Sequence, residues 1–261
     1  MSPALHGSGQ IRFWLCVGLV IGMLGGVALA WRWTAAGTGA RVAVLGAGKS
    51  VSVLITNDHR RVLIASGSNG TAFSNALGAA LPPFVDNIDL VLIDSRASAD
   101  LIDRVKALDA KRTMMLPDPE RDDPAETILR SFQVDLGEGV ILSVRIEPAG
   151  KWSAELRTSA GILSISPGGV DLAPALVRIT LDGTTAVEPG GTPSIWIGPA
   201  ANGLVRTSHQ ATVGTGSVLP ITMDGSAFRI PREFFGAVES DQRTNHFPSL
   251  DGQAIVEFRP D

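Results

Sequence analysis

Residues 88–103 read IDLVLIDSRASADLID, and this stretch decides the class of the fold. Its first six residues are almost continuously apolar, which is typical of a β-strand buried on both faces. From residue 98 to residue 110 apolar residues recur at helical spacing, with Leu101 and Val105 on one face. A doubly buried strand followed at once by an amphipathic helix indicates an α/β fold.

Upstream of this unit, the sequence predicts a β-meander followed by a helix. Three alternating apolar segments, 41–45, 50–55 and 61–65, are separated by the turns 46–48 and 57–60. A helix is predicted over 72–81, with Thr71 or Ser74 as its cap, and Pro82 and Pro83 end it. The meander therefore leads into the strand at 88–93.

Downstream, strands dominate the sequence. A short strand at 113–116, a charged loop at 117–124 and a short helix at 125–132 come first. Further strands are predicted at 134–136, 140–147, 152–158, 161–165, 175–181, 194–197 and 204–207, with more from 218 to 258. Strand–helix alternation followed by a β-rich half predicts an α/β sandwich of two mixed sheets.

The N-terminal segment has the features of a membrane anchor. After a flank at 1–12, residues 13–31 carry no charge, and tryptophans lie near both ends of this run. We expect a transmembrane helix over 13–33, a linker at 34–41 and one domain over 42–261. Gly22 and Gly26 have the small-xxx-small spacing of a helix-packing face. The alternative is a signal peptide cleaved near Ala30, which would release a secreted protein.

The charge of the domain argues against nucleic acid as a partner. The first 41 residues hold three arginines and no acid, so the remainder has 19 basic and 26 acidic residues. Proteins that bind nucleic acids usually present a basic surface, because neutralising phosphates supplies much of their affinity. We therefore expect the membrane and an unknown protein as partners.

Five pieces of the sequence match a known framework in order. They are LGAGK at 45–49, VLIASG at 62–67, the helical segment 75–81, IDLVLI at 88–93 and WSAELRTSAGILSI at 152–165. Together they resemble the C-terminal metallo-β-lactamase-like domain of competence protein ComEC. The resemblance implies a metallo-β-lactamase-like αββα sandwich, in which helices flank both sheets, and an extracytoplasmic position for the domain.

The residues that would hold metal in the resembling proteins are replaced here. Their HxHxDH run follows the buried strand, and its His and Asp positions correspond to Ser95, Ala97, Ala99 and Asp100. The Asp of the piece that matches VLIASG at 62–67 becomes Ala65, and the region of the bridging Asp reads Ser-Pro-Gly at 166–168. A zinc site needs three or four N, S or O ligands. We therefore expect no metal, no cofactor and no metal-dependent activity.

Three functional interpretations follow from these residues. The favoured one is a non-catalytic, membrane-anchored module, a pseudoenzyme, for binding or assembly in the cell envelope. The second is a hydrolase whose site was rebuilt near Ser95 and Asp100, within a residual pocket that includes Asp94. The third is a structural membrane partner acting through Gly22 and Gly26. Carboxylates at the start of a helix also stabilise its N-terminus, so Asp94 and Asp100 have a purely structural interpretation as well.

Overall fold

The computed structural model divides the chain into two units, residues 1–38 and 39–261. It describes residues 17–18, 40–81, 87–117, 130–147, 151–167, 175–182, 195–199, 210–224, 227–234 and 253–257. In the first unit Val17 and Gly18 are helical, and the rest of the predicted anchor, including Gly22 and Gly26, lies outside the described residues. Within the described ranges, no helix has the length and apolar character needed to cross a bilayer.

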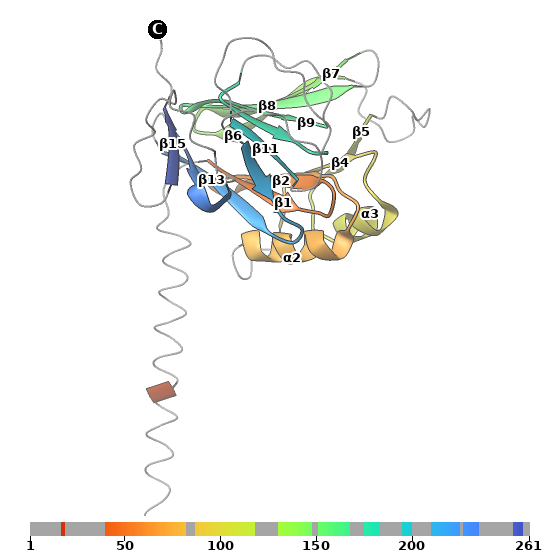
Figure 1. Cartoon of the computed structure of the whole chain (residues 1–261). Helices are drawn as coiled ribbons and strands as arrows, with labels where there is room; N and C mark the ends of the chain where they lie inside the picture. The colour runs from red at the N-terminus through yellow and green to blue at the C-terminus, as the bar shows by residue number, and fades with distance from the viewer. Residues whose placement is uncertain are drawn as a thin grey trace, which may run out of the picture. The chain divides into compact units, whose positions relative to one another are not determined.

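The first sheet of the second unit has eight strands in the order β15–β14–β13–β1–β2–β3–β4–β5 (Figure 1). Strands β3, β4 and β5 run parallel to one another, and the other neighbours are antiparallel. The predicted meander forms its centre. The bounds are β1 Arg41–Gly46, β2 Val51–Asn57, β3 Arg60–Ala65, β4 Leu90–Asp94, β5 Thr113–Leu116, β13 Val218–Asp224, β14 Ala227–Pro231 and β15 Gln253–Glu257.

The second sheet has seven strands in the order β12–β11–β10–β9–β8–β7–β6. Strands β6 to β9 are antiparallel, whereas β9 to β12 run parallel. Both sheets are therefore mixed, as the sequence predicted. The bounds are β6 Phe132–Gly137, β7 Val140–Ile146, β8 Trp152–Thr158, β9 Gly161–Ser166, β10 Val177–Thr180, β11 Ile195–Pro199 and β12 Gln210–Val213.

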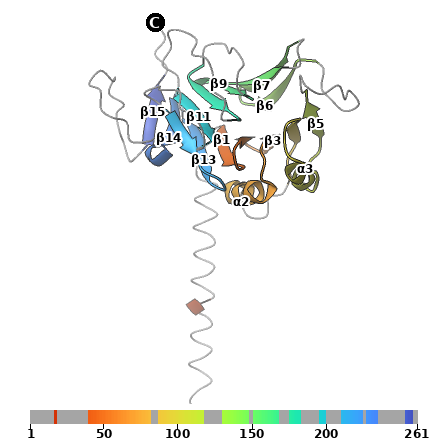
Figure 2. The ribbon, with the colours of Figure 1, turned by 45° about the vertical axis from the view of Figure 1, so that its right-hand side comes forward.

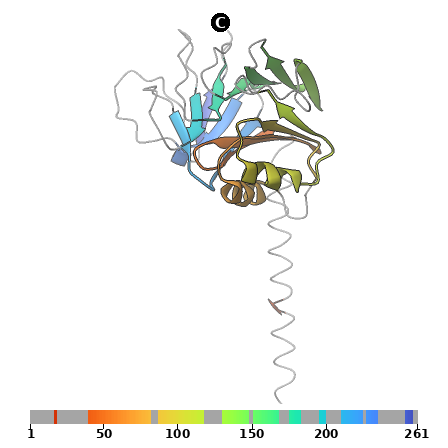
Figure 3. The ribbon, with the colours of Figure 1, turned by 90° about the vertical axis from the view of Figure 1, so that its right-hand side faces the viewer.

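Two helices, α2 (Gly70–Ala80) and α3 (Ala99–Lys106), cover the face of the first sheet that points away from the second (Figures 2 and 3). The alternation of side chains along β4 shows why the helices lie on this face of the sheet. Leu90 and Leu92 belong to the core between the sheets, and Val91 and Ile93 belong to the core under the helices. Successive side chains of a strand point to opposite faces, so this run of apolar residues fills both cores.

The expected helices on both outer faces are not observed in the described part of the second unit, whose two α-helices both pack on the first sheet. The helix predicted over 125–132 is also wrong at its end. Residues 125–129 lie outside the described ranges, and Phe132 begins β6, where it pairs with Val144. Pairing with a neighbouring strand overrides the local helical pattern there.

Candidate functional site

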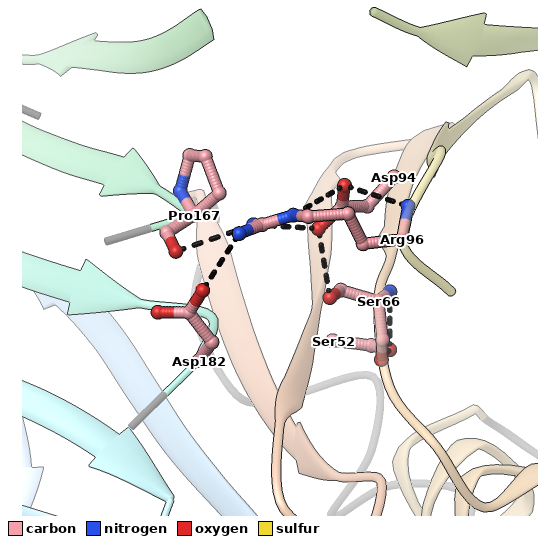
Figure 4. A network of polar contacts seen from close by, with 6 residues as sticks. All are labelled: Ser52, Ser66, Asp94, Arg96, Pro167 and Asp182. Carbon is pink, nitrogen blue, oxygen red and sulfur yellow. Dashed lines mark hydrogen bonds and ion pairs between the residues drawn. The ribbon is translucent and has the colours of Figure 1, made fainter. Parts of the chain in front are cut away.

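A polar network lies where strands of the two sheets end together (Figure 4). Strand β4 of the first sheet ends at Asp94, and β9 and β10 of the second sheet end at Ser166 and Thr180. The backbone joins the sheets at this place, because Val51 N donates a 2.8 Å hydrogen bond to the carbonyl of Leu181. The network consists of Ser52, Ser66, Asp94, Arg96, Pro167 and Asp182.

The guanidinium group of Arg96 is the centre of this network. Its Nε and Nη2 donate to Asp94 Oδ1 and Oδ2 at 3.3 and 3.1 Å. Its Nη1 donates to Asp182 Oδ2 at 2.8 Å, and its Nη2 also reaches the carbonyl of Pro167 at 3.2 Å. A planar fork of donors suits two carboxylates at once. Arg96 thus connects the end of β4 with the segments that follow β9 and β10.

The electrostatic balance of the site favours the charged form of Arg96. The side chain of Asp94 is only 2% exposed, whereas those of Arg96 and Asp182 are 41% and 23% exposed. Partial burial by itself lowers the pKa of Arg96. The hydrogen bonds and negative charges of Asp94 and Asp182 raise the pKa by more than burial lowers it, so the pKa lies above its ordinary value. The guanidinium therefore stays protonated at any physiological pH.

A hydroxyl and a backbone N–H donate to the buried carboxylate of Asp94, beside the guanidinium of Arg96. Ser66 Oγ donates to Asp94 Oδ2 at 3.1 Å, and the backbone N–H of Arg96 donates to Oδ1 at 3.3 Å. Ser52 Oγ in turn accepts from Ser66 N at 3.0 Å and donates to the Ser66 carbonyl at 2.6 Å. Buried charges need such partners, and Asp94 has them from the Ser66 hydroxyl and from the backbone N–H and guanidinium of Arg96.

The three residues of the predicted pocket have different surroundings in the structure. Asp94 is in the network, and Ser95 beside it is 8% exposed, with a hydroxyl that has no hydrogen-bond partner among the described residues. Asp100 lies in the first turn of α3, where its Oδ2 accepts from Gly70 N at 2.9 Å and its Oδ1 lies 3.7 Å from Arg104 Nε. Asp100 thus has the structural role of joining the starts of the two helices.

Sequence reasoning missed Arg96 and Asp182. A usable signal for Arg96 was its position two residues after a buried strand that ends in an acid. Asp182 gave no local signal, because its role depends on a strand of the other sheet. What brings them together is the approach of the ends of β4 and β10.

The residues at the strand ends do not fit a two-metal centre. Ala97 and Ala99 offer no side-chain ligand atom, and the carboxylates of Asp94 and Asp182 are both bound to the guanidinium of Arg96. A metal ion placed there would meet a fixed positive charge at contact distance. In the described ranges no three His, Cys, Asp or Glu side chains are grouped to hold a metal. The resemblance's metal chemistry is therefore not carried by these residues.

Among the comparisons with known proteins, the comparison with solved structures is the one that found similar proteins. No known protein family matches the sequence, and no curated protein matches it. The Rm3 metallo-beta-lactamase is 17% identical over 49% of this chain and 60% of that one, with a TM-score of 0.36. MEM-A1, a subclass B3 metallo-beta-lactamase from a soil metagenome library, is 17% identical over 53% of this chain and 65% of that one, with a TM-score of 0.38.

Zn(2+)-bound PqqB from Methylobacterium extorquens is also similar. It is 14% identical over 55% of this chain and 71% of that one, with a TM-score of 0.33. The chain spans less than two thirds of the two metallo-beta-lactamases.

Proposed function

We propose that the chain is a membrane-anchored, non-catalytic module with a metallo-β-lactamase-like αββα fold, resembling the ComEC domain, that serves binding or assembly in the cell envelope. One observation supports this proposal most. The guanidinium of Arg96 is held by Asp94, Asp182 and the Pro167 carbonyl at the strand ends. This is the loop region after β4 in which the resemblance would put metal ligands.

The chemistry of a guanidinium explains why this arrangement favours a non-catalytic role. Metal ions in a hydrolytic centre bind water, lower its pKa and stabilise the charge of the transition state. A guanidinium has donors only, does not lose its proton in proteins and cannot coordinate water as a Lewis acid. Arg96 therefore supplies positive charge that connects the two sheets, without a means of activating water.

The anchor and the location belong to the same proposal. Residues 13–33 would hold the module in the cell membrane as a single helix, with the domain outside the cytoplasm and an unknown protein as its partner. Cleavage near Ala30 would instead give a secreted protein. Cell fractionation with N-terminal sequencing of the mature chain separates the two outcomes.

The decisive experiment measures metal and activity on the full chain purified in detergent. We expect less than stoichiometric zinc and manganese and no phosphodiesterase activity above that of a buffer control. An Asp94→Asn variant serves as the matched control, since it removes a carboxylate from the network. Stoichiometric metal together with phosphodiesterase activity that falls with a chelator and with Asp94→Asn would overturn the proposal.

Two other functions have their own tests. A hydrolase rebuilt near Ser95 and Asp100 would show turnover without metal, lost in Ser95→Ala and in Asp100→Asn. The buried Ser95 hydroxyl and the bonds of Asp100 to Gly70 and Arg104 argue against it. A structural membrane partner would lose its co-purifying proteins in Gly22→Leu or Gly26→Leu and keep them in variants of the domain.

A further inference from the structure

Strand β5 is the last strand of the first sheet, and its one neighbour among the described residues is β4 (Figures 1 and 2). Val91 N of β4 donates a 2.8 Å hydrogen bond to the carbonyl of Arg112, so the backbone of Arg112 faces β4. In a parallel pair, successive residues of a strand turn their N–H and C=O groups alternately to one side and the other. The N–H and C=O groups of Thr113 and Met115 therefore face the open side of β5, where no described strand pairs with them.

The side chains of β5 present apolar surface on both faces of this edge. Met114 is partly buried against the core between the sheets, and Met115 is partly buried against the core under the helices. Methionine is unbranched and adapts its shape to different apolar partners. Edge strands are usually protected by charges, proline or a bulge, and Thr113–Leu116 contains none of these. A strand added beside β5 would cover open backbone groups and apolar side chains together.

Two cations lie at the start of this edge. Lys111 and Arg112 directly precede β5, and both are exposed. Lys111 pairs with Asp89 at 2.6 Å, whereas Arg112 forms no ion pair within the described ranges. A guanidinium binds a carboxylate through two parallel hydrogen bonds, which fix its position as well as its charge. The group that complements this end of β5 is therefore a carboxylate.

We propose that β5 is a docking edge for an extended acidic segment of a partner protein, which adds to the first sheet as an antiparallel strand. Thr113 and Met115 each exchange two backbone hydrogen bonds with the residue opposite. In this direction the C-terminal part of the segment lies beside Arg112, where an Asp or Glu side chain binds. Because β5 has only four residues, the carboxylate supplies much of the selectivity. The inference rests on the proposed binding role and names its surface and the chemistry of its partner.

The first experiment titrates the full chain in detergent with a fluorescent peptide of alternating Val and Thr that ends in two Glu. Fluorescence anisotropy measures the affinity, and the same peptide ending in two Lys is the control. We expect the Glu peptide to bind at least about tenfold more tightly than the Lys peptide. Arg112→Glu should abolish this preference, whereas Arg104→Glu, at an exposed position of α3, should leave it unchanged.

A second experiment tests the backbone pairing. Met115→Pro removes the N–H that faces the open side and keeps the bonds to β4, so the chain should fold and bind the Glu peptide at least about tenfold more weakly. Met114→Pro removes an N–H that faces β4 and should lower the melting temperature. Hydrogen exchange on the native chain needs no variant. The Glu peptide should slow the exchange of the Thr113 and Met115 amides.

Three results would overturn the inference. They are equal affinity for the two peptides, unchanged binding in folded Met115→Pro, and unchanged exchange at Thr113 and Met115. Native chains that form dimers as their concentration rises, and lose them in Met115→Pro, would show that a second copy occupies the edge, which also contradicts an acidic partner. Failure of the proposed function has a different readout, namely metal with chelator-sensitive hydrolysis in the native chain.

Discussion

The Nη1 atom of Arg96 lies 2.8 Å from Oδ2 of Asp182, although 86 positions separate the two residues in the chain. Arg96 follows a strand of the first sheet and Asp182 follows a strand of the second. Asp182 also pairs through its backbone with Ser50, so side chain and main chain join the sheets at the same edge. The stability of this edge can be tested directly.

Replacing Arg96 by Ala should lower the free energy of unfolding by about 2 kcal/mol, because the buried Asp94 carboxylate loses its cation. The loss is smaller than for a fully buried pair, since Arg96 is 41% exposed and Ser66 still donates to Asp94. The stability of Arg96→Lys should lie between that of the native chain and that of Arg96→Ala, because an ammonium keeps the positive charge but lacks the planar fork of donors. Urea denaturation measures these changes.

Arg104→Ala is the matched control for Arg96→Ala. Its partner Asp100 lies 3.7 Å away, and the two side chains are 51% and 57% exposed. Exposed pairs of this kind contribute about 0.5 kcal/mol or less. If Arg96→Ala costs no more than Arg104→Ala, then the Arg96 network does not hold the sheets together.

The ion pair of Asp89 predicts a pH dependence of stability. Burial raises the pKa of Asp89, but the hydrogen bond from Lys111, at 2.6 Å, and that from Arg61 N, at 2.8 Å, outweigh it and hold the pKa below 3.8. A carboxyl whose pKa is lower in the folded chain stabilises it fully above the unfolded pKa. This contribution is lost as the pH falls through the folded pKa.

Asp89→Asn should therefore destabilise the chain by about 0.5 kcal/mol near neutral pH, an amount reduced by the partial exposure of the pair. The difference between native and variant should disappear once the pH falls below the folded pKa of Asp89. Thermal unfolding across this pH range measures it. A difference that stays constant with pH would show that the Asp89 charge is not the source of the effect.

Asn57 connects the end of β2 with the β6–β7 hairpin. It is fully buried, and its Nδ2 donates to the carbonyls of Leu136 and Gly137 at 3.1 and 2.9 Å. Asn57→Ala should lower the free energy of unfolding by about 2 kcal/mol, because the buried carbonyl of Leu136 and the part-buried carbonyl of Gly137 lose their donor. Asn57→Asp should cost more at neutral pH, since it buries a charge that faces two carbonyls. Asn75→Ala, on the exposed side of α2, is the control and should change stability little.

Two glycines predict opposite effects of the same substitution. A Cβ at Gly46 would lie 1.9 Å from the backbone oxygen of Gly214, whereas a Cβ at Gly78 in α2 meets nothing within 4 Å. Gly46→Ala should therefore strongly destabilise or prevent folding, because backbone must move. Gly78→Ala should raise the free energy of unfolding by about 1 kcal/mol through helix propensity. A tolerated Gly46→Ala would contradict the close approach of these two segments.

The sequence alone determined which segments become strands and helices in the first half of the domain. Apolar alternation over residues 41–65, the run at 88–93 and the helical spacing after residue 98 correspond to β1–β4 and α3 within a few residues. These signals are local, because burial on one or both faces imposes a period on the chain itself. The cap of α2 was less well predicted. Asn69, rather than Thr71 or Ser74, accepts the hydrogen bond from Ala72 N.

Only the tertiary structure decided which residues form the polar network at the strand ends. The sequence singled out Asp94, which lies in the polar network. It did not show that Asp100 would bond to Gly70, or that Arg96 would meet Asp182 and Pro167. Those contacts depend on which strands become neighbours and on how the two sheets stack. Hydrogen bonds between segments that are distant in the sequence determine both the strand neighbours and the stacking. The local periodicity of the sequence does not show these hydrogen bonds.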